Sequence, residues 1–516
     1  MGHHYNLGLK FIDVVRAHGA RTVIETTSGE SSTYTDLNAL SNRVAHLFVD
    51  CGFKRGDVAA IFHDKSPLGF AVMIACLKLG IVYANLDAES PWERLRKILQ
   101  TARPRGLINL FSEVPHSGEV AETTDVINVR GAEISHALPT FSSEEPAKMR
   151  EVTGADPAYI MFTSGSTGFP KGAVMSHANV LNFISWAREC FQIIPDDIFT
   201  GANPICFDNS VFDFYVSLFS GAKLVPVRAD EMRDGRRLVS IVNERRCSIW
   251  FSVPSLLVYL LTTRVLKGGD FPTIRKIIFG GEGFPKRKLK QLFDMFADRA
   301  DLENVYGPTE CTCICSSHRI ENDDFTDMKS LATLGHLAPN FDYEILATDN
   351  SDPNFGELFL RGPNVGLGYY NDAQRTAKSF IQNPMHRRHV DIGYRTGDLV
   401  RRDNSGRLYF KGRSDFQIKH MGYRIELEEI EAALGTIGCV NECAVIYQKL
   451  GDGLGQIAGF VSVDSASSAD ELLQRVSEIV PSYMVPKKMV ILDSLPKGAN
   501  GKIDKIALEE SLMSRI

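Results

Sequence analysis

The stretch Thr163-Ser-Gly-Ser-Thr-Gly-Phe-Pro-Lys-Gly172 indicates the fold more strongly than any other part of the chain. Its three glycines allow turns with positive φ and let the backbone approach a ligand closely. Its hydroxyl side chains and Lys171 are suited to phosphate oxygens. Apolar runs typical of strands lie on both sides, at 158–162 and 172–176, and a helical pattern covers 177–190. The stretch therefore predicts a phosphate-binding loop between two strands.

Two other interpretations of this loop are weaker. A Walker A loop needs a lysine followed by serine or threonine at the start of a helix, whereas Lys171 is followed by Gly172 and a strand-like run. A flexible Gly/Ser linker is the second alternative, and the apolar strands on both sides argue against it.

Length and composition set the general class. The 516 residues exceed the size at which one core keeps growing, so we expect two or more domains. A hydrophobic content of 44% and a charged content of 23% are ordinary for a globular protein. The net charge of −6 argues against nucleic acid or an anionic membrane as a partner. No apolar run reaches the roughly 18 residues of a membrane span, and residues 1–5 do not resemble a signal peptide. We expect a cytoplasmic protein.

The ten cysteines are scattered, which argues against a disulfide framework in a chain of this length. Cys311, Cys313 and Cys315 alternate like residues on one face of a strand. Neither this group nor the pair Cys439 and Cys443 has the C-x-x-C spacing of structural zinc sites, so we interpret them as small buried residues and predict no metal there.

Strand and helix patterns alternate from residue 9 to about residue 409, as in an α/β protein with largely parallel sheets. The segment 136–155 is polar and loop-like. After residues 412–415 a second, smaller pattern begins. The buried strands that we expect in the first part include 58–62, 222–227 and 276–279, and the second part contains a helix at 425–434, strands at 444–448 and 457–463, and a helix at 469–480.

Further motifs accompany the loop in a fixed order. They are Tyr83-Ala-Asn-Leu-Asp87 with Pro91-Trp-Glu-Arg94, Asn304-Val-Tyr-Gly-Pro-Thr-Glu310, Gly356-Glu-Leu-Phe-Leu-Arg-Gly362, Tyr394-Arg-Thr-Gly-Asp398, Gly412-Arg-Ser-Asp-Phe-Gln-Ile-Lys419 with Gly422-Tyr-Arg-Ile-Glu426, and Leu495-Pro-Lys-Gly-Ala-Asn-Gly-Lys-Ile503. The series, from about residue 30 to 505, resembles the adenylate-forming superfamily of acyl-CoA synthetases, luciferases and peptide-synthetase adenylation domains. The resemblance implies a large N-terminal domain, 1–413, of mostly parallel sheets flanked by helices. It also implies a small mobile C-terminal α+β domain, 414–516.

The resemblance further implies ATP and Mg²⁺ as cofactors. Lys171 is then expected to hold the β- and γ-phosphates, Glu310 to bind magnesium, and Tyr306 to stack on adenine. Asp398 is expected to accept hydrogen bonds from the ribose, with Arg413 close by. A surface acid is the structural alternative for Glu310. The full set of implied nucleotide-binding residues is Thr163, Ser164, Gly165, Ser166, Thr167, Gly168, Gly281, Glu282, Gly283, Asn304, Tyr306, Gly307, Thr309, Asp398 and Arg413.

The C-terminal part supplies the remaining catalytic group. By resemblance, Lys502 reaches the substrate carboxylate during adenylation and stabilises the charge of the transition state. A solvated lysine is the structural alternative. Asp415 occupies the hinge position, and rotation there would withdraw Lys502 and bring residues 419–422 to the active site for thioester formation.

The substrate class depends on Phe207-Asp-Asn-Ser-Val-Phe212. In amino-acid-activating members of the superfamily an aspartate at the position of Asp208 pairs with the α-ammonium group, and fatty-acyl and aryl members usually lack it. The structural alternative is an aspartate that caps the following helix. The side-chain pocket implied by the resemblance consists of Asn209, Phe212, Ile278, Gly280, Val305, Cys313 and Ile314, where Gly280 leaves room for a small or medium side chain.

The acceptor is expected to be a separate carrier protein. The tract Ile249-Trp-Phe-Ser-Val-Pro-Ser255 with Phe279-Gly-Gly-Glu-Gly283 is similar to D-alanine–carrier protein ligases and free-standing adenylation domains of nonribosomal peptide synthesis. We therefore predict an AMP-forming amino acid–carrier protein ligase that loads a phosphopantetheine thiol. A carboxylate–CoA ligase for a small organic acid is the alternative, weakened because Asn203-Pro-Ile-Cys206 lacks an aromatic or histidine gate. A catalytically silent protein would have lost Lys171, Glu310, Asp398 or Lys502, and all four are present.

Overall fold

The computed structural model describes residues 4–111, 127–166, 168–347, 352–450, 454–464, 467–497 and 503–513. It contains two compact units. Unit 1 comprises Met1–Ala88, Ala102–Phe162 and Gly172–Ser414, and unit 2 comprises Glu89–Thr101, Thr163–Lys171 and Asp415–Ile516. The loop predicted to bind phosphate thus groups with C-terminal residues. The domain bounds 1–413 and 414–516 stay a prediction.

The larger sheet of unit 1 has nine strands in the order β15-β14-β13-β12-β11-β9-β10-β1-β2. Its central pairs, from β13 to β1, are parallel, and the edge pairs β1–β2, β13–β14 and β14–β15 are antiparallel. The strands are β1 (Thr22–Glu25), β2 (Ser31–Thr33), β9 (Ile198–Gly201), β10 (Lys223–Pro226), β11 (Ile249–Ser252), β12 (Lys276–Gly280), β13 (Asp301–Tyr306), β14 (Ser316–Arg319) and β15 (His336–Leu337).

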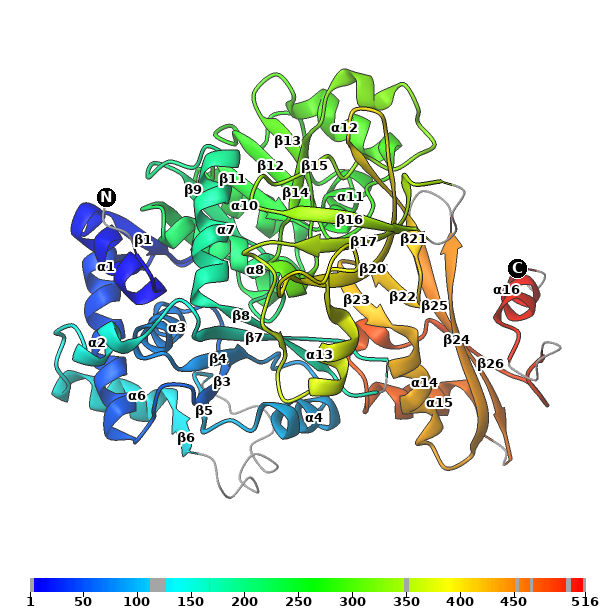
Figure 1. Ribbon diagram of the computed structural model, residues 1–516, viewed down its shortest axis with the longest axis horizontal. Helices are drawn as coiled ribbons and strands as arrows, with labels where there is room; N and C mark the ends of the chain where they lie inside the picture. Colours follow the sequence, from blue (N-terminus) through cyan, green and yellow to red (C-terminus); the bar gives the residue numbers. More distant parts are fainter. Residues whose placement is uncertain are drawn as a thin grey trace. The chain divides into compact units, whose positions relative to one another are not determined.

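Helices α10 (Gly235–Glu244), α11 (Pro254–Thr262) and α12 (Lys286–Phe296) pack on one face of this sheet (green in Figure 1). Side chains alternate between the two faces along a strand. Trp250 therefore points into the core formed with these helices, while its neighbour Phe251 contributes to the core on the other face. Because both faces are buried, the central strands β9, β11 and β12 are mostly apolar, as in parallel sheets generally, whereas the edge strands β2, β14 and β15 are partly exposed.

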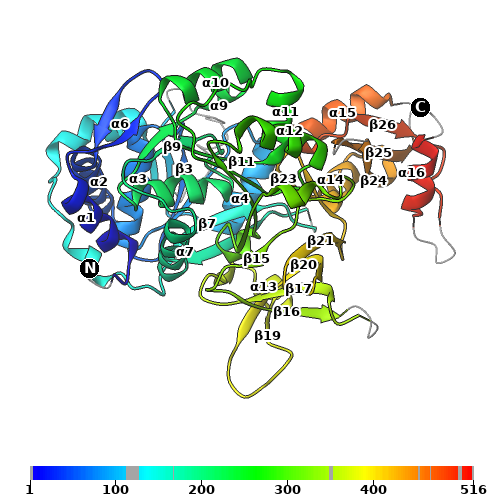
Figure 2. The ribbon, with the colours of Figure 1, turned by 90° about the horizontal axis from the view of Figure 1, so that it is seen from above.

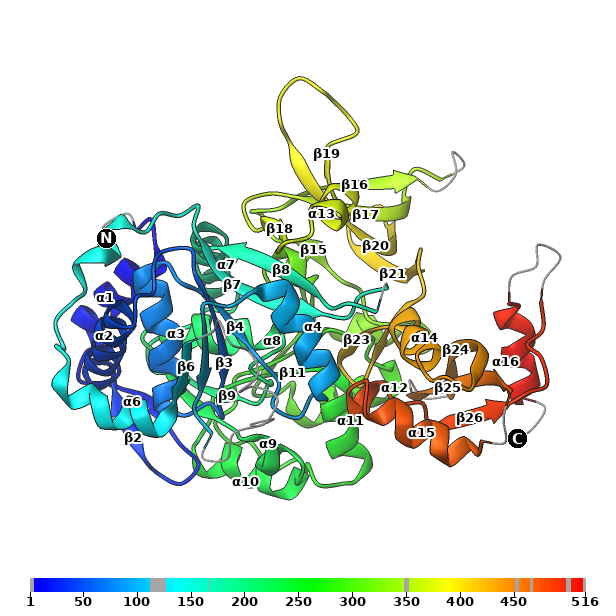
Figure 3. The ribbon, with the colours of Figure 1, turned by 90° about the horizontal axis from the view of Figure 1, so that it is seen from below.

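The second sheet of unit 1 has seven strands in the order β18-β8-β7-β4-β3-β5-β6. Helix α3 (Pro67–Leu79) is buried at every residue from Gly69 to Leu79, because it lies beside α1 (Leu7–His18) and α2 (Tyr34–Asp50) within the core (Figure 3). The strands are β3 (Val58–Phe62), β4 (Val82–Asn85), β5 (Gly106–Asn109), β6 (Ile127–Arg130), β7 (Pro157–Thr163), β8 (Lys171–Ser176) and β18 (Gly368–Tyr369). Unit 1 also contains the α-helices α6 (Gly131–Ala137), α7 (His177–Cys190), α9 (Ala229–Met232) and α13 (Ala373–Ser379), whereas α4 (Trp92–Ala102) belongs to unit 2 except for its last residue.

A third sheet in unit 1 is antiparallel. It contains β16 (Asp342–Ala347), β17 (Phe355–Arg361), β20 (Ile392–Arg402) and β19 (Phe380–Gln382), with β21 (Leu408–Arg413) paired to β20. The sequence motifs at 356–362 and 394–398 lie on its strands β17 and β20. The α/β fold with mostly parallel sheets is confirmed for the first two sheets, and this third sheet adds an antiparallel layer.

Unit 2 is an α+β structure. A hairpin of β22 (Gln417–His420) and β23 (Tyr423–Glu426) precedes the sheet of β24 (Val440–Leu450), β25 (Leu454–Val463) and β26 (Lys488–Ile491). Helices α14 (Leu427–Gly435) and α15 (Ala469–Ser477) cover one face through residues such as Val445, and α16 (Lys505–Met513) covers the other through Ala444 and Ile446 (Figures 1 and 2).

Several predicted elements are confirmed and others need correction. Strand 58–62 is β3 and helix 177–190 is α7, with the predicted bounds. The helix expected at 425–434 begins only at Leu427, because Ile425 and Glu426 end strand β23. The segment 136–155 was predicted to be a loop, and it contains the end of α6 and two short 3₁₀ turns. No helix in the described ranges combines the length and apolar character of a membrane span.

Candidate active site

In unit 1, three of the predicted nucleotide-binding residues meet at the end of the antiparallel sheet. Asp398 on β20 is the register partner of Arg413 on β21. The Tyr306 hydroxyl, at the end of β13, donates to Asp398 Oδ2 at 2.5 Å, and Arg413 Nη1 donates to Oδ1 at 2.5 Å. Burial and the neighbouring carboxylate of Asp398 raise the pKa of Tyr306 well above its usual range. Its hydroxyl therefore remains a hydrogen-bond donor at neutral pH.

Glu310 lies in a short 3₁₀ turn, Thr309–Cys311, and is fully buried. The hydroxyl of Tyr369, on β18, donates to Glu310 Oε1 at 2.6 Å. A buried carboxylate is costly without a partner, and carboxylate oxygen is a preferred ligand of a hard divalent cation. The position therefore has the chemistry of a magnesium ligand, and the interpretation of Glu310 as a surface acid is wrong.

The chain turns sharply after Glu310. Thr312 and Cys313 have φ of 60° and 73°, the left-handed region that non-glycine residues rarely adopt. A Cβ on Gly307 would lie 2.2 Å from the Cys313 carbonyl oxygen, so only glycine lets the two segments approach. The expectation that Cys311, Cys313 and Cys315 share one strand face is wrong, because this turn replaces the strand; all three are buried, as predicted.

Asp208 contacts the nucleotide motif directly. Thr309 Oγ1 donates to Asp208 Oδ2 at 2.6 Å. Asp208 precedes the short helix α8 (Asn209–Val211), yet its side chain makes no capping hydrogen bond and its backbone is already helical, at φ −63°. The alternative of a helix-capping aspartate is therefore wrong, and the carboxylate is oriented toward the Tyr-Gly-Pro-Thr-Glu segment.

Most of the predicted pocket residues belong to the main hydrophobic core of unit 1. The segment Phe212–Val216 forms a π-helix, a type often found at functional sites. The Phe212 ring is fully buried against Phe251 and Phe191, with centroid distances of 5.1 and 5.5 Å. A Cβ on Gly280 would lie 2.4 Å from the Val305 carbonyl oxygen, so the space expected at Gly280 is taken by the adjacent strand β13. The other predicted pocket residues are Asn209, which is half-buried, and Ile278, Cys313 and Ile314, which are buried.

Two predicted nucleotide-binding residues, Glu282 and Asn304, form hydrogen bonds with the protein backbone. Glu282 Oε1 accepts from the backbone N–H of Ser255 at 2.7 Å, in the first turn of α11. Asn304 Nδ2 donates to the Thr333 carbonyl at 2.7 Å. Gly281, directly before Glu282, has φ of 96°, a conformation that favours glycine, and Gly283, directly after it, packs against Leu331.

In unit 2, the predicted phosphate loop binds carboxylates. Lys171 Nζ lies 3.2 Å from Glu426 Oε1, and the backbone N–H of Gly165 donates to Glu429 Oε2 at 3.0 Å. These carboxylate oxygens stand in for phosphate oxygens, since both are anionic acceptors. Gly168 has φ of 75°. The loop thus offers a cation and a backbone donor to anionic oxygens. Thr167 and Lys502 lie outside the described residues.

The sequence matches the AMP-binding enzyme family over residues 11–370 and the C-terminal domain of AMP-binding enzymes over residues 429–502. This chain belongs to the AMP-binding enzyme family. It is 31% identical to the L-proline--[L-prolyl-carrier protein] ligase of Streptomyces coelicolor, over 95% of this chain and 94% of that protein. It is 30% identical to the D-alanine--D-alanyl carrier protein ligase of Lacticaseibacillus casei, over 96% and 97%. The crystal structure of IdnL1 matches with a TM-score of 0.80 and 26% identity, over 96% of this chain and 100% of that one.

These matches confirm the predicted resemblance to adenylate-forming enzymes. The roles of the site residues stay predictions. Three further residues of this AMP-binding enzyme lie at the predicted phosphate loop and were missed from the sequence. Arg94, Glu426 and Glu429 are buried together at the phosphate loop. Arg94 and Glu426 lie inside motifs that were recognised in the sequence, but their ion pairs with Glu429 and Lys171 could not be predicted from those motifs. Glu429 is one of several acids on α14, and nothing in the spacing distinguishes it from its neighbours.

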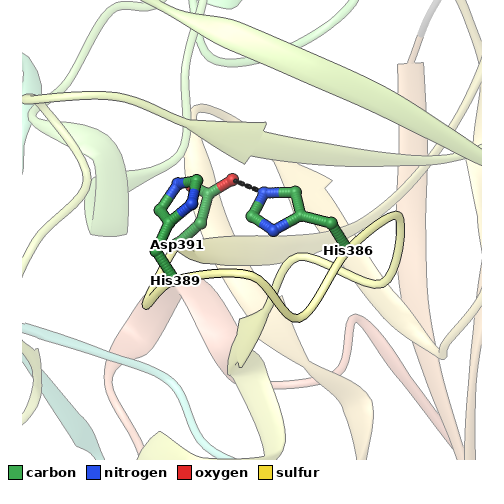
Figure 4. Close-up of side chains that lie close together, drawn as sticks. All are labelled: His386, His389 and Asp391. Carbon is green, nitrogen blue, oxygen red and sulfur yellow. Dashed lines mark hydrogen bonds and ion pairs between the residues drawn. The ribbon is translucent and has the colours of Figure 1, made fainter.

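A second cluster in the AMP-binding enzyme has the composition of a metal site. His386, His389 and Asp391 lie close together in the connection between β19 and β20, which projects from the antiparallel sheet (Figures 2 and 4). Asp391 Oδ2 already accepts hydrogen bonds from His386, Asn383 and Arg361 at 2.9 to 3.0 Å. The Arg361 guanidinium already neutralises the Asp391 carboxylate, which disfavours a metal cation there. We interpret the cluster as an ion-paired turn.

Proposed function

We propose that this enzyme activates an amino acid with ATP and transfers it to the phosphopantetheine thiol of a separate carrier protein. In the first step a carboxylate oxygen of the amino acid attacks the α-phosphorus of ATP, and the bond to the β-phosphate oxygen breaks to release pyrophosphate. In the second step the thiolate sulfur attacks the carbonyl carbon and AMP leaves. The thiol proton passes to solvent. Because the reaction consumes ATP, we place it in the cytoplasm.

The hydrogen bond from Thr309 to Asp208 supports the amino-acid assignment most directly. It joins a half-buried carboxylate to the motif that carries Tyr306 and Glu310. A carboxylate at this position is suited to pair with a cation, and the α-ammonium group of an amino acid is such a cation. The names of the proline and D-alanine carrier-protein ligases agree with this assignment. The apolar residues around Asp208, with Phe212 buried in the core, favour a small or medium side chain.

ATP and Mg²⁺ fit the residues that are present. Lys171 and the N–H of Gly165 already hold anionic oxygens, and the buried Glu310 carboxylate suits a divalent cation. The ion would neutralise phosphate charge when bound. Asp398, Tyr306 and Arg413 form the polar cluster proposed for the nucleoside, in which the Asp398 oxygens accept hydrogen bonds. By resemblance, Lys502 stabilises the charge that develops during attack, and Asp415 is the hinge.

The proposal is tested by trapping the activated amino acid as a hydroxamate with hydroxylamine and ATP. Wild-type enzyme should form hydroxamate from one amino acid and not from the same acid without its amino group. Asp208→Ala should lower kcat/KM for that amino acid by roughly 100-fold, since the charge pair between the carboxylate and the ammonium group is lost. The matched control is Asp298→Ala, whose side chain is 79% exposed on the surface. Equal activity of the Asp208→Ala variant and wild type would contradict the assignment.

A further inference from the structure

Asp208, the proposed partner of the ammonium group, lies on a stretch of chain without regular structure. Residues 202–208, which the structure describes in full, belong to no helix or strand and connect β9 to α8. Such backbone has no ladder of hydrogen bonds to fix it, so other groups must satisfy and hold it. We call residues 201–207 the anchor segment, because its position determines where the Asp208 carboxylate lies.

Lys65 binds the start of the anchor segment. Its Nζ donates to the carbonyls of Gly201 and Val227, both at 2.8 Å. Gly201 ends β9 and Val227 directly follows β10, the parallel neighbour of β9. Lys65 follows β3 and has φ of 63°, in the left-handed region that non-glycine residues rarely adopt. Its ammonium therefore joins the carboxyl ends of two strands at the point where the anchor segment begins.

Asp213, on the π-helix, binds the middle of the anchor segment. Its Oδ2 accepts from the backbone N–H of Asn203 at 3.2 Å and from Asn203 Nδ2 at 2.9 Å. Asn203 Nδ2 also donates to the Phe251 carbonyl on β11 at 3.0 Å. Asn203 and Asp213 are ten residues apart, and Asp208 lies midway between them. These hydrogen bonds therefore close a loop of chain that has Asp208 at its centre.

The burial of Asp213 needs an explanation. The residue is 4% exposed, and its Oδ1 has no hydrogen-bond partner among the described residues. Burial raises the pKa of its carboxyl, whereas the Asn203 amide and the Lys65 ammonium lower that pKa. A well-packed apolar side chain often fills such a position at lower cost than a buried charge. The hydrogen bonds to the anchor segment explain the carboxylate better than packing does.

We infer that Lys65 and Asp213 are positioning residues for amino-acid binding, which fix the anchor segment at two points and thereby the carboxylate of Asp208. This inference rests on the proposed function. Lys65 fixes the segment where it leaves β9, and Asp213 fixes it at Asn203. Misplacement of a binding group by about 1 Å can cost 10²-fold in activity. Loss of either contact should therefore weaken use of the amino acid and leave use of ATP unchanged.

The test compares Asp213→Leu with Asp213→Asn in amino-acid-dependent ATP–pyrophosphate exchange. Leucine offers no acceptor to Asn203, so the KM for the amino acid should rise at least about 10-fold, while the KM for ATP stays within about twofold of wild type. Asparagine keeps the shape and one acceptor oxygen. Asp213→Asn should therefore keep the KM for the amino acid within about threefold of wild type.

Asp197→Leu is the matched control. Asp197 is 2% exposed, directly precedes β9 and accepts hydrogen bonds from Ile194 and Arg275. This variant removes an equally buried carboxylate at the opposite end of the same strand, so it measures the general effect of such a loss. The ratio of the KM for the amino acid to the KM for ATP should stay at the wild-type value in this control.

Lys65→Met is a second variant, which keeps the hydrogen bonds between Asn203 and Asp213 and remains a test should Asp213→Leu fail to fold. It leaves the Gly201 carbonyl without its ammonium donor. The KM for the amino acid should rise at least about threefold, again with the KM for ATP unchanged. A Lys65→Met enzyme with the wild-type ratio of the two KM values would contradict the role of Lys65.

Hydrogen exchange measures the anchor segment without any substrate. The backbone amides of residues 202–207 should exchange at least about 10-fold faster in Asp213→Leu than in wild type or Asp213→Asn. A wild-type enzyme that activated no amino acid would contradict the proposed function, and the exchange rates would still test the anchoring. Unchanged exchange in Asp213→Leu, or a KM ratio equal to that of Asp197→Leu, would overturn the inference and leave amino-acid activation untouched.

Discussion

Thr309 helps to orient the carboxylate of Asp208. The Thr309 hydroxyl holds Oδ2 at 2.6 Å, and no capping hydrogen bond competes for the carboxylate. Hydrogen bonds to a charged group contribute about 1.5–3 kcal/mol. Thr309 is therefore expected to affect activity with the amino acid through the orientation of Asp208.

We predict that Thr309→Val lowers kcat/KM for the amino acid by about 10- to 100-fold, because the donor to Asp208 is lost at nearly constant volume. Thr309→Ser, which keeps the hydroxyl, should stay close to wild type. The measurement is amino-acid-dependent exchange of pyrophosphate into ATP at varied amino acid and fixed ATP. A Thr309→Val enzyme with wild-type kcat/KM would remove this hydrogen bond from the account.

At the residue scale the sequence was most informative where a motif carries chemistry in a fixed context. Asp398 and Arg413 were predicted at the ribose and Tyr306 at the adenine of one nucleotide, and the three side chains lie in one hydrogen-bonded cluster. Gly280 was interpreted as free space, and the neighbouring backbone of Val305 fills that space. The sequence around Gly280 does not show which strand lies beside it, so the contact with Val305 could not be predicted. The contact of Glu429 with Gly165 could not be predicted either, because it joins segments far apart in the sequence.

At the scale of elements, the turn after Glu310 illustrates a feature that periodicity could not predict. Alternating cysteines suggested a strand, yet Thr312 and Cys313 both adopt positive φ. The close approach of Gly307 to Cys313 forces this geometry. By contrast, β3 and α7 were predicted with their bounds because a buried strand and an amphipathic helix impose strong local patterns.

Gly307→Ala should lower the free energy of unfolding by about 2 kcal/mol or more, since the new methyl would collide with backbone atoms that cannot yield. Gly268→Ala is the control, because a Cβ there meets nothing within 4 Å. Denaturant unfolding of both variants provides the comparison. Equal stabilities would show that the turn adapts.

The junction of α1 and α7 should be sensitive to acid. His177, the first residue of α7, is fully buried and accepts from the Leu7 N–H through Nδ1 at 3.1 Å, and burial lowers the pKa of its ring from 6.5 to about 4. Between these values the unfolded chain binds more protons than the folded one, so stability falls as the pH falls from 6.5 to 4. The full loss is about 3 kcal/mol.

His177→Gln should reduce the slope in this pH range by about half, because glutamine has no proton to gain there while the buried His63, whose pKa is also lowered from 6.5 to about 4, keeps its own contribution. His136→Gln, at an exposed position on α6, should leave the slope as it is in wild type. Urea unfolding at pH 4.5, 5.5 and 6.5 measures the slope for each protein. If the full slope persisted in His177→Gln, another group would be responsible for the acid sensitivity.

At the scale of the whole molecule, the order of motifs predicted the family and two parts of the chain, 1–413 and 414–516. The two compact units of the structure do not follow this simple division of the sequence. Residues 89–101 and 163–171 belong to the unit that contains the C-terminal residues. Their grouping arises from contacts such as Lys97 Nζ with the Gly168 carbonyl at 2.8 Å, which join segments far apart in sequence. No local pattern encodes such a contact.

Lys502→Ala should separate the two half-reactions. Loss of one electrostatic contact to a transition state typically costs about 10²–10³ in rate, so pyrophosphate exchange should fall by that factor. Transfer to a thiol from supplied aminoacyl-AMP should remain near the wild-type rate. Lys487→Ala, an exposed lysine, serves as the control. Equal losses in both steps would contradict the role of Lys502.

The most direct test of amino-acid activation is substrate-dependent ATP–pyrophosphate exchange across the proteinogenic amino acids, their D-forms, common β-amino acids, and short fatty and aryl acids. We predict a strong signal from an amino acid with a small or medium side chain, and its loss in Asp208→Ala. A signal confined to acids without an ammonium group would contradict the role of Asp208 and indicate a carboxylate–CoA ligase instead.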